Sequence, residues 1–197
     1  ARRAIRSSSR IALYSAPSSA VLASASTAPA RRSALRNSWT LVASAEMWNA
    51  IYEGIKRVNT IIAKVPNVTG FGPGEQEQIM GEAYFLRALH YHNLVKYYDG
   101  VPLRLEPLSD PDLADDITRA TAAEVYTQIL ADLAQAEVLM TNGTDPDNHA
   151  TLGAAKALTA RAHLYQGNYA LALAKAQEVE ALGYILAPSY SDLWSSD

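Results

Sequence analysis

Apolar side chains recur at the 3.6-residue spacing of an amphipathic helix from about residue 45 onward. Positions three and four residues apart share one face of a helix, so each such stripe predicts a helix that buries that face. The first stripe comprises Trp48, Ile51, Tyr52, Ile55, Val58, Asn59 and Ile62. Pro66 follows it and is expected to stop the helix, because proline cannot donate a backbone hydrogen bond.

A second helical pattern runs from Glu75 to the Asp99-Gly100 pair, after a loop rich in glycine, proline and asparagine. An acidic residue in the first turn favours a helix start, since it complements the positive end of the helix dipole. The predicted buried stripe comprises Ile79, Ala83, Leu86, His90, Asn93 or Leu94, and Tyr97. Val101 precedes a proline and is therefore predicted to be extended.

Three more helices are predicted downstream. Thr121 and Glu124 have the spacing of a capping box, which predicts a helix start. Its buried stripe comprises Val125, Ile129, Leu133, Ala136 and Met140. Alanine-rich helices at 152–166 and 169–182 flank Gly167-Asn168, a texture similar to tetratricopeptide repeats. The pattern predicts an all-α fold, a tetratricopeptide-like stack of antiparallel helix pairs with an irregular N-terminal extension.

Charge divides the chain near residue 45. Residues 1–45 contain seven arginines and no lysine or acid; with a net charge of −3 for the chain, residues 46–197 carry −10. This contrast predicts a basic Ser/Ala/Arg-rich extension at 1–44 and a helical-repeat domain at 45–197. The extension is typical of a poorly packed segment, and a basic arm that docks on a membrane or an acidic partner is the alternative.

Composition excludes several kinds of chemistry. The chain has no cysteine, which rules out disulfides and thiolate sites within it, and no apolar run long enough for a membrane-spanning helix. The small net charge argues against a nucleic-acid partner. His90 and His92 are two residues apart and point to different sides of their helix. We therefore expect no enzyme activity, no cofactor and no metal site.

Several ordered motifs together resemble the SusD/RagB family. They are Trp48-x3-Tyr52-x2-Ile55-x3-Asn59, the stretches from Gly81 to Ala88, Leu94 to Leu103 and Glu124 to Leu133, Arg119, and Gly153 to Tyr169. The resemblance covers about residues 45–197 and corresponds to the N-terminal half of family members. At one position the order differs, because the family commonly has Tyr-Gly-Asp-Val-Pro where this chain has Tyr98-Asp99-Gly100-Val101-Pro102.

The resemblance implies a non-catalytic, outer-membrane nutrient-binding protein. Family members are lipoproteins that capture oligosaccharides or peptides for a TonB-dependent, SusC-like transporter. The expected location is the cell envelope, at the outer membrane or its periplasmic face. The family's lipid anchor is an N-terminal cysteine, so any anchor of this protein would have to precede Ala1.

Aromatic residues next to amide or carboxylate groups are the candidate ligand contacts, because sugar rings stack on aromatic faces and their hydroxyls bond to polar groups. These candidates are Trp39, Trp48, Asn49, Phe71, Tyr98 and Asp99. Trp48 and Tyr97 also lie on predicted buried stripes and are expected in the core. Trp39 and Phe71, in less regular segments, are therefore the preferred candidates. The alternative function is a helical-repeat scaffold or accessory subunit of a larger, possibly membrane-bound, complex.

Overall fold

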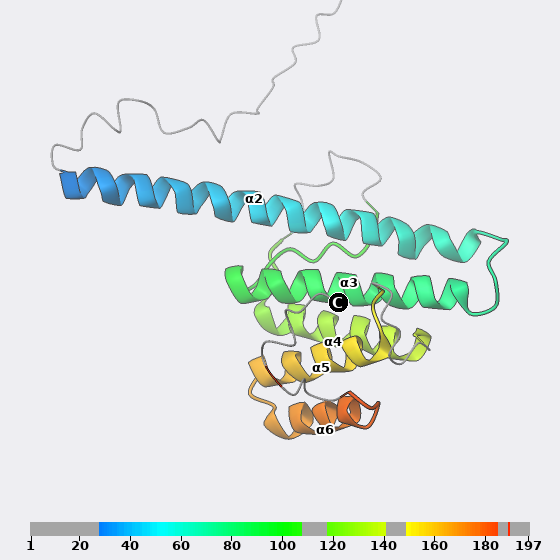
Figure 1. The fold of residues 1–197 in the computed structure, drawn as a ribbon. Helices are drawn as coiled ribbons and strands as arrows, with labels where there is room; N and C mark the ends of the chain where they lie inside the picture. Colours follow the sequence, from blue (N-terminus) through cyan, green and yellow to red (C-terminus); the bar gives the residue numbers. More distant parts are fainter. Residues whose placement is uncertain (1–27, 108–117, 141–148, 185–188, 190–197) are drawn as a thin grey trace, which may run out of the picture. The chain divides into compact units, whose positions relative to one another are not determined.

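The computed structural model describes residues 28–107, 118–140, 149–184 and 189, with side chains from residue 44 onward. The elements are α2 (Ala28–Lys64), the 3-10 turn η1 (Val65–Asn67), α3 (Glu75–Tyr98), α4 (Ala122–Leu139), α5 (Leu152–Tyr165) and α6 (Tyr169–Glu180) (Figure 1). Among these residues the extended pairing is limited to one isolated bridge, between Pro102 and Arg119. The prediction of an all-α fold is confirmed.

Helix α2 begins much earlier than the apolar period predicted. Its first residue is Ala28, so residues 28–44 are helical rather than irregular. Pro29 explains the difference: in the first turn of a helix its missing N–H costs nothing and its fixed φ favours the start. The chain divides into two units within this helix, Ala1–Asn49 and Ala50–Asp197. The predicted boundary at residue 44 stays a prediction, and residues 1–27 lie outside the described part.

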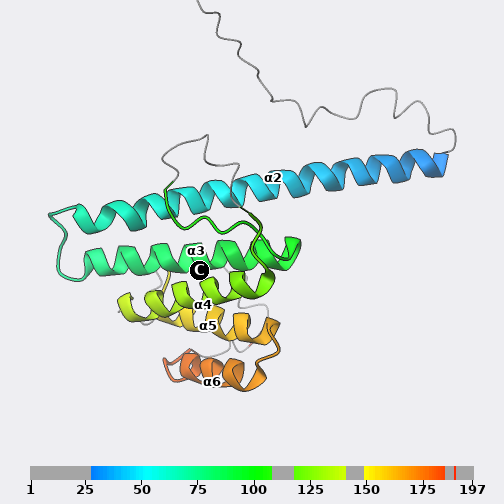
Figure 2. The ribbon, with the colours of Figure 1, turned by 180° about the vertical axis from the view of Figure 1, so that it is seen from behind.

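In the second unit, α3, α4, α5 and α6 form a stack in which each helix packs against the next (Figures 1 and 2). The portion of α2 from Ala50 onward packs on α3. The contact is close at Gly54, where a Cβ would lie 2.5 Å from Nε2 of His90. None of the described helices combines the length and the apolar character that crossing a bilayer requires.

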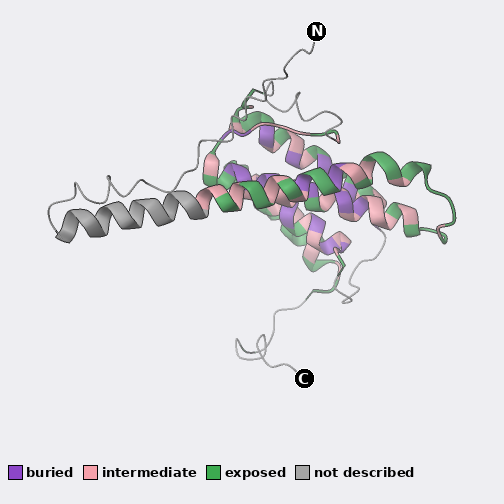
Figure 3. Ribbon diagram, turned by 90° about the horizontal axis from the view of Figure 1, so that it is seen from above, coloured by how far each residue is buried: buried purple, intermediate pink, exposed green. Residues whose placement is uncertain are grey.

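The core follows the prediction in α4 and departs from it in α3. All five residues of the predicted α4 stripe are buried. Figure 3 shows that buried positions alternate with exposed ones along the helices. In α3, Ala83 and Leu94 are buried as predicted, but Leu86 is 39% exposed and Tyr97 is 59% exposed. The prediction that these two side chains lie in the core is wrong. The buried face of α3 instead includes Arg87, Ala88, Tyr91, His92 and Val95.

Helix α4 starts at the predicted capping box. The Thr121 hydroxyl accepts a hydrogen bond from the Glu124 N–H at 3.3 Å, and Glu124 accepts one from the Thr121 N–H at 2.8 Å. These two bonds satisfy backbone donors that would otherwise have no partner at the helix start. The bonds that the Thr121 N–H and hydroxyl donate to the Glu124 carboxylate lower the pKa of Glu124, because they favour its charged form.

Candidate functional site

The predicted ligand residues do not gather in one place. Phe71 precedes α3, whereas Tyr98 and Asp99 lie at its far end. Helix α3 has 24 residues, which corresponds to about 36 Å at 1.5 Å per residue. Phe71 therefore cannot share a site with Tyr98 and Asp99. Trp48 and Asn49 lie in α2 within the first unit. Trp39 lies in the same helix, and its side chain is outside the described part.

The turn after α3 is tightly constrained. Asp99 is exposed and has a φ of 62° and a ψ of −139°, a conformation that glycine adopts more easily than other residues. At Gly100 a Cβ would lie 2.2 Å from the carbonyl oxygen of Ala120. The Arg119 guanidinium donates to the carbonyl oxygens of Tyr98 and Gly100. The Arg119 side chain, which comes from the residues just before α4, thus holds this turn in place.

The extended segment that follows, residues 101–106, is anchored by two tyrosines. The Tyr52 hydroxyl donates to the Pro102 carbonyl at 2.7 Å. The Tyr91 hydroxyl donates to the Arg104 carbonyl at 2.8 Å and accepts from the Arg104 N–H at 2.6 Å. Burial raises the pKa of Tyr91 to about 12 and also raises the pKa of Tyr52. Both hydroxyls therefore keep their protons and act as donors.

Asn59 of α2 and Arg87 of α3 also bind the backbone of this segment. The Asn59 amide donates to the Arg104 carbonyl at 2.9 Å and to the Glu106 carbonyl at 3.3 Å. Nη1 of Arg87 donates to the Leu105 carbonyl at 3.0 Å and to Oδ1 of Asn59 at 3.0 Å. Side chains of α2 and α3 therefore bind the carbonyl oxygens of residues 102, 104, 105 and 106, and the isolated bridge between Pro102 and Arg119 adds to this anchoring.

Asp132 of α4 completes this network. Its two carboxylate oxygens accept from Nε and Nη2 of Arg87 at 2.8 and 2.7 Å, and Oδ1 also accepts from Gln128 at 2.8 Å. Burial acts to lower the pKa of Arg87, but the hydrogen bonds and charge of Asp132 outweigh it and raise that pKa. The buried guanidinium is thus charged, and each of its three nitrogens donates at least one hydrogen bond, as a buried charge requires to be tolerated.

Asn59 belongs to a predicted buried stripe and Arg87 to a family motif, but the sequence pattern indicates no role for either residue. The informative signal was a polar side chain on an apolar face, since buried polar groups need partners. Those partners are backbone carbonyls some 45 residues away, which no local pattern reveals. The result is an anchored segment, residues 101–106, that directly follows the turn at Tyr98 and Asp99. A ligand would not have to order such a segment on binding.

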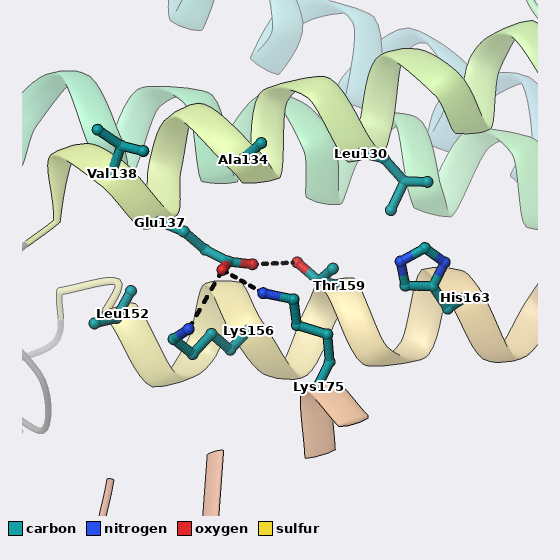
Figure 4. Close-up of a pocket in the computed structure, with 9 residues that line it drawn as sticks. All are labelled: Leu130, Ala134, Glu137, Val138, Leu152, Lys156, Thr159, His163 and Lys175. Carbon is teal, nitrogen blue, oxygen red and sulfur yellow. Dashed lines mark hydrogen bonds and ion pairs between the residues drawn. The ribbon is translucent and has the colours of Figure 1, made fainter. Parts of the chain in front are cut away.

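A second candidate is an open pocket of about 520 Å³ between α4, α5 and α6 (Figure 4). Its lining residues are Leu130, Ala134, Glu137, Val138, Leu152, Lys156, Thr159, His163 and Lys175. Glu137 accepts from Thr159 at 2.8 Å and from Lys175 at 2.7 Å, and it lies 3.4 Å from Lys156. Glu178 pairs with both lysines as well, so two carboxylates balance two ammonium groups and join the three helices.

The lining of this pocket suits a sugar poorly. None of its nine residues is a tyrosine, tryptophan or phenylalanine, so a sugar ring would have no large aromatic face on which to stack. The described residues also contain no cluster of three or more histidine, aspartate or glutamate side chains that could hold a metal ion. The end of α3 is therefore the better candidate site.

Comparisons with known proteins agree with this fold. The SusD-like family described as "Starch-binding associating with outer membrane" matches residues 7–164. SusD-like protein P38 from Formosa agariphila is 30% identical over 145 residues, which are 72% of this chain and 27% of that protein. SusD-like protein P25 from the same organism is 24% identical over 153 residues, which are 76% of this chain and 29% of that protein.

Solved structures give the same result. A laminarin-binding SusD-like protein aligns with a TM-score of 0.70 and 35% identity, covering 75% of this chain and 34% of its own. Surface glycan-binding protein A from Bacteroides fluxus aligns with a TM-score of 0.62 and 27% identity, covering 75% of this chain and 32% of its own. The chain thus spans about a third or less of the length of these relatives. From the extent of the family match, the chain belongs to the SusD-like family.

Proposed function

We propose that this chain is part of a non-catalytic glycan-binding protein of the outer membrane. Family membership supports the class of function, and two relatives are named as a laminarin-binding protein and a surface glycan-binding protein. The mechanism is capture of an oligosaccharide and its transfer to a TonB-dependent transporter. Peptides are the other ligand class that the sequence motifs imply.

The observation that carries the location of the site is the anchored segment at the end of α3. Four backbone carbonyls between residues 102 and 106 are bound by buried or half-buried side chains, and Arg119 holds the adjoining turn. We place the ligand against Tyr98 and Asp99, which this framework fixes. A tyrosine ring supplies a stacking surface, and a carboxylate accepts hydrogen bonds from sugar hydroxyls.

Isothermal titration of the full chain with a panel of oligosaccharides and peptides tests this proposal. The panel includes laminarin and starch oligosaccharides. Tyr98→Ala is expected to weaken glycan binding by about tenfold or more, or about 1.4 kcal/mol. Phe71→Ala is the matched control, because it removes an aromatic ring about 36 Å away along α3. Absence of binding to the whole panel, or loss with Phe71→Ala alone, would overturn the proposal.

The transporter and the location in the cell envelope belong to the same proposal. A pull-down from membranes in mild detergent, followed by mass spectrometry, is expected to recover a transporter barrel. Recovery of an unrelated complex would favour the scaffold alternative instead. One structural feature supports that alternative: Tyr169 and Leu173, four residues apart on one face of α6, are 70% and 61% exposed. Exposed apolar side chains grouped on one helix are typical of protein contacts.

A further inference from the structure

His92 of α3 is buried beneath two tyrosines of the neighbouring helices. Its side chain is 1% exposed, and neither ring nitrogen has a hydrogen-bond partner among the described residues. The rings of Tyr126 in α4 and Tyr165 in α5 pack edge-on against it, with centroids 6.2 and 5.2 Å away. Tyr165 is nevertheless 52% exposed. The histidine thus orients two aromatic rings at the surface where three helices meet.

Two exposed cations flank these rings. Lys96 lies four residues after His92 on α3, and Arg161 lies four residues before Tyr165 on α5, so each shares a helix face with its neighbour. Burial lowers the pKa of His92, and the positive charges of Arg161 and Lys96 lower it further.

Their charges are not neutralised within the part of the chain that the structure describes. The ion pairs found there include neither Lys96 nor Arg161. The ammonium of Lys96 instead lies 5.1 Å from the centroid of the Tyr97 ring. Two cations that have no acidic partner among the described residues are unusual in residues 46–197, which carry a net charge of −10. We call the surface formed by Lys96, Tyr126, Arg161 and Tyr165 the α3–α5 patch.

We propose that the α3–α5 patch binds an acidic sugar unit, one that carries a carboxylate or a sulfate ester. The proposal rests on the glycan-binding function above and names the class of sugar; Lys96 and Tyr98, two residues apart on α3, point to different sides of that helix, so the patch is a surface distinct from the Tyr98 turn. The exposed face of Tyr165 provides the stacking surface for the sugar ring. The planar guanidinium of Arg161 donates two parallel hydrogen bonds to a carboxylate or sulfate. Lys96 adds a point charge on the opposite side.

The test compares acidic and neutral oligosaccharides of equal length with the full chain. The probes are an oligogalacturonate for the carboxylate, a sulfated dextran oligomer for the sulfate ester, and a laminarin oligosaccharide as the neutral sugar. Isothermal titration at about 20 and about 300 mM NaCl gives the dissociation constants, since attraction between exposed charges is screened at the higher salt. We expect one acidic probe to bind at least tenfold more tightly than laminarin at low salt.

The double variant Lys96→Gln/Arg161→Gln is expected to remove this preference and leave laminarin binding unchanged. Lys56→Gln/Arg57→Gln is the matched control, because it removes the same two residue types from an exposed face of α2. Equal affinity for all three sugars, or an unchanged preference in the first variant, would overturn the inference. So would inorganic sulfate binding as tightly as the sulfated oligomer. Binding of laminarin alone refutes only this inference, whereas no binding at all refutes the proposed function.

Discussion

Arg87 and Asp132 form a bidentate ion pair inside the helix stack. Their side chains are 7% and 2% exposed, and the two hydrogen bonds measure 2.8 and 2.7 Å. The third guanidinium nitrogen reaches Asn59 and the Leu105 carbonyl. One arginine therefore connects α2, α3, α4 and the segment that forms the candidate site.

Loss of either partner of this pair should be strongly destabilising. Asp132→Ala leaves the Arg87 charge buried and unpaired, which costs about 3–5 kcal/mol. Urea denaturation of the purified chain measures the change in the free energy of unfolding. Glu53→Ala is the control: its pairs with Lys56 and Arg57 are exposed, so it should cost less than about 1 kcal/mol. Similar costs for the two variants would contradict the assigned role of the pair.

Tyr91 should control the order of the segment at Arg104. Tyr91→Phe removes the hydroxyl that bonds both the N–H and the carbonyl of Arg104. The carbonyl keeps its bond to Asn59, but the N–H is left without that acceptor, at a cost of about 1–3 kcal/mol. Hydrogen exchange should then be faster at the Arg104 amide. Tyr97→Phe is the control, because the Tyr97 ring is exposed, and it should leave the exchange rate of the Arg104 amide unchanged. Equal exchange rates in the two variants would show that the Tyr91 hydroxyl does not order this segment.

The sequence determined helix boundaries better than it determined the buried face of α3. Glu75, Thr121 and the Asp99-Gly100 pair are local signals, and the helices start or end beside each of them. The stripe predicted for α3 was right at Ala83 and Leu94 and wrong at Leu86 and Tyr97, and it did not include the buried Arg87. The partner that makes Arg87 tolerable in the core lies 45 residues away, and no helical period encodes that distance.

The candidate site was predictable to a similar extent. Tyr98 and Asp99 were selected because aromatic and acidic side chains suit sugars, and the structure places them on a rigid turn. That Phe71 lies at the other end of the same helix follows from the predicted helix length alone. The α3–α5 patch was not predictable, because it brings together residues of three helices around a buried histidine.

Acidification should destabilise the stack through His92. Burial, with Arg161 and Lys96, lowers the pKa of His92 in the folded chain below its ordinary value of 6.5. The unfolded chain therefore binds the proton more readily, so stability is present above about pH 6.5 and falls as the pH decreases below it. His92→Phe keeps an aromatic ring and should reduce this loss between pH 7.5 and 5.5. Burial also lowers the pKa of His90, so the loss of stability that His90 causes should remain in this variant. If His92→Phe loses as much stability on acidification as the unmodified chain, His92 is not the group responsible.

The order of Asp99 and Gly100 predicts opposite effects for two substitutions. Asp99→Gly should stabilise the fold by about 1 kcal/mol, because a residue with a side chain is strained at a φ of 62° and a ψ of −139°. Gly100→Ala should destabilise it, since the new Cβ would lie 2.2 Å from the Ala120 carbonyl oxygen. Thermal unfolding monitored by circular dichroism compares both. A loss of stability in Asp99→Gly would show that the Asp99 side chain stabilises the turn.

The most direct test of the account is hydrogen exchange of the full chain with and without the tightest-binding oligosaccharide of the panel. The account predicts slower exchange in residues 97–106 when the glycan is bound, and no change in the 66–74 loop that contains Phe71. Protection of the Phe71 loop instead, or bound glycan that leaves residues 97–106 unprotected, would contradict the placement of the site at the end of α3.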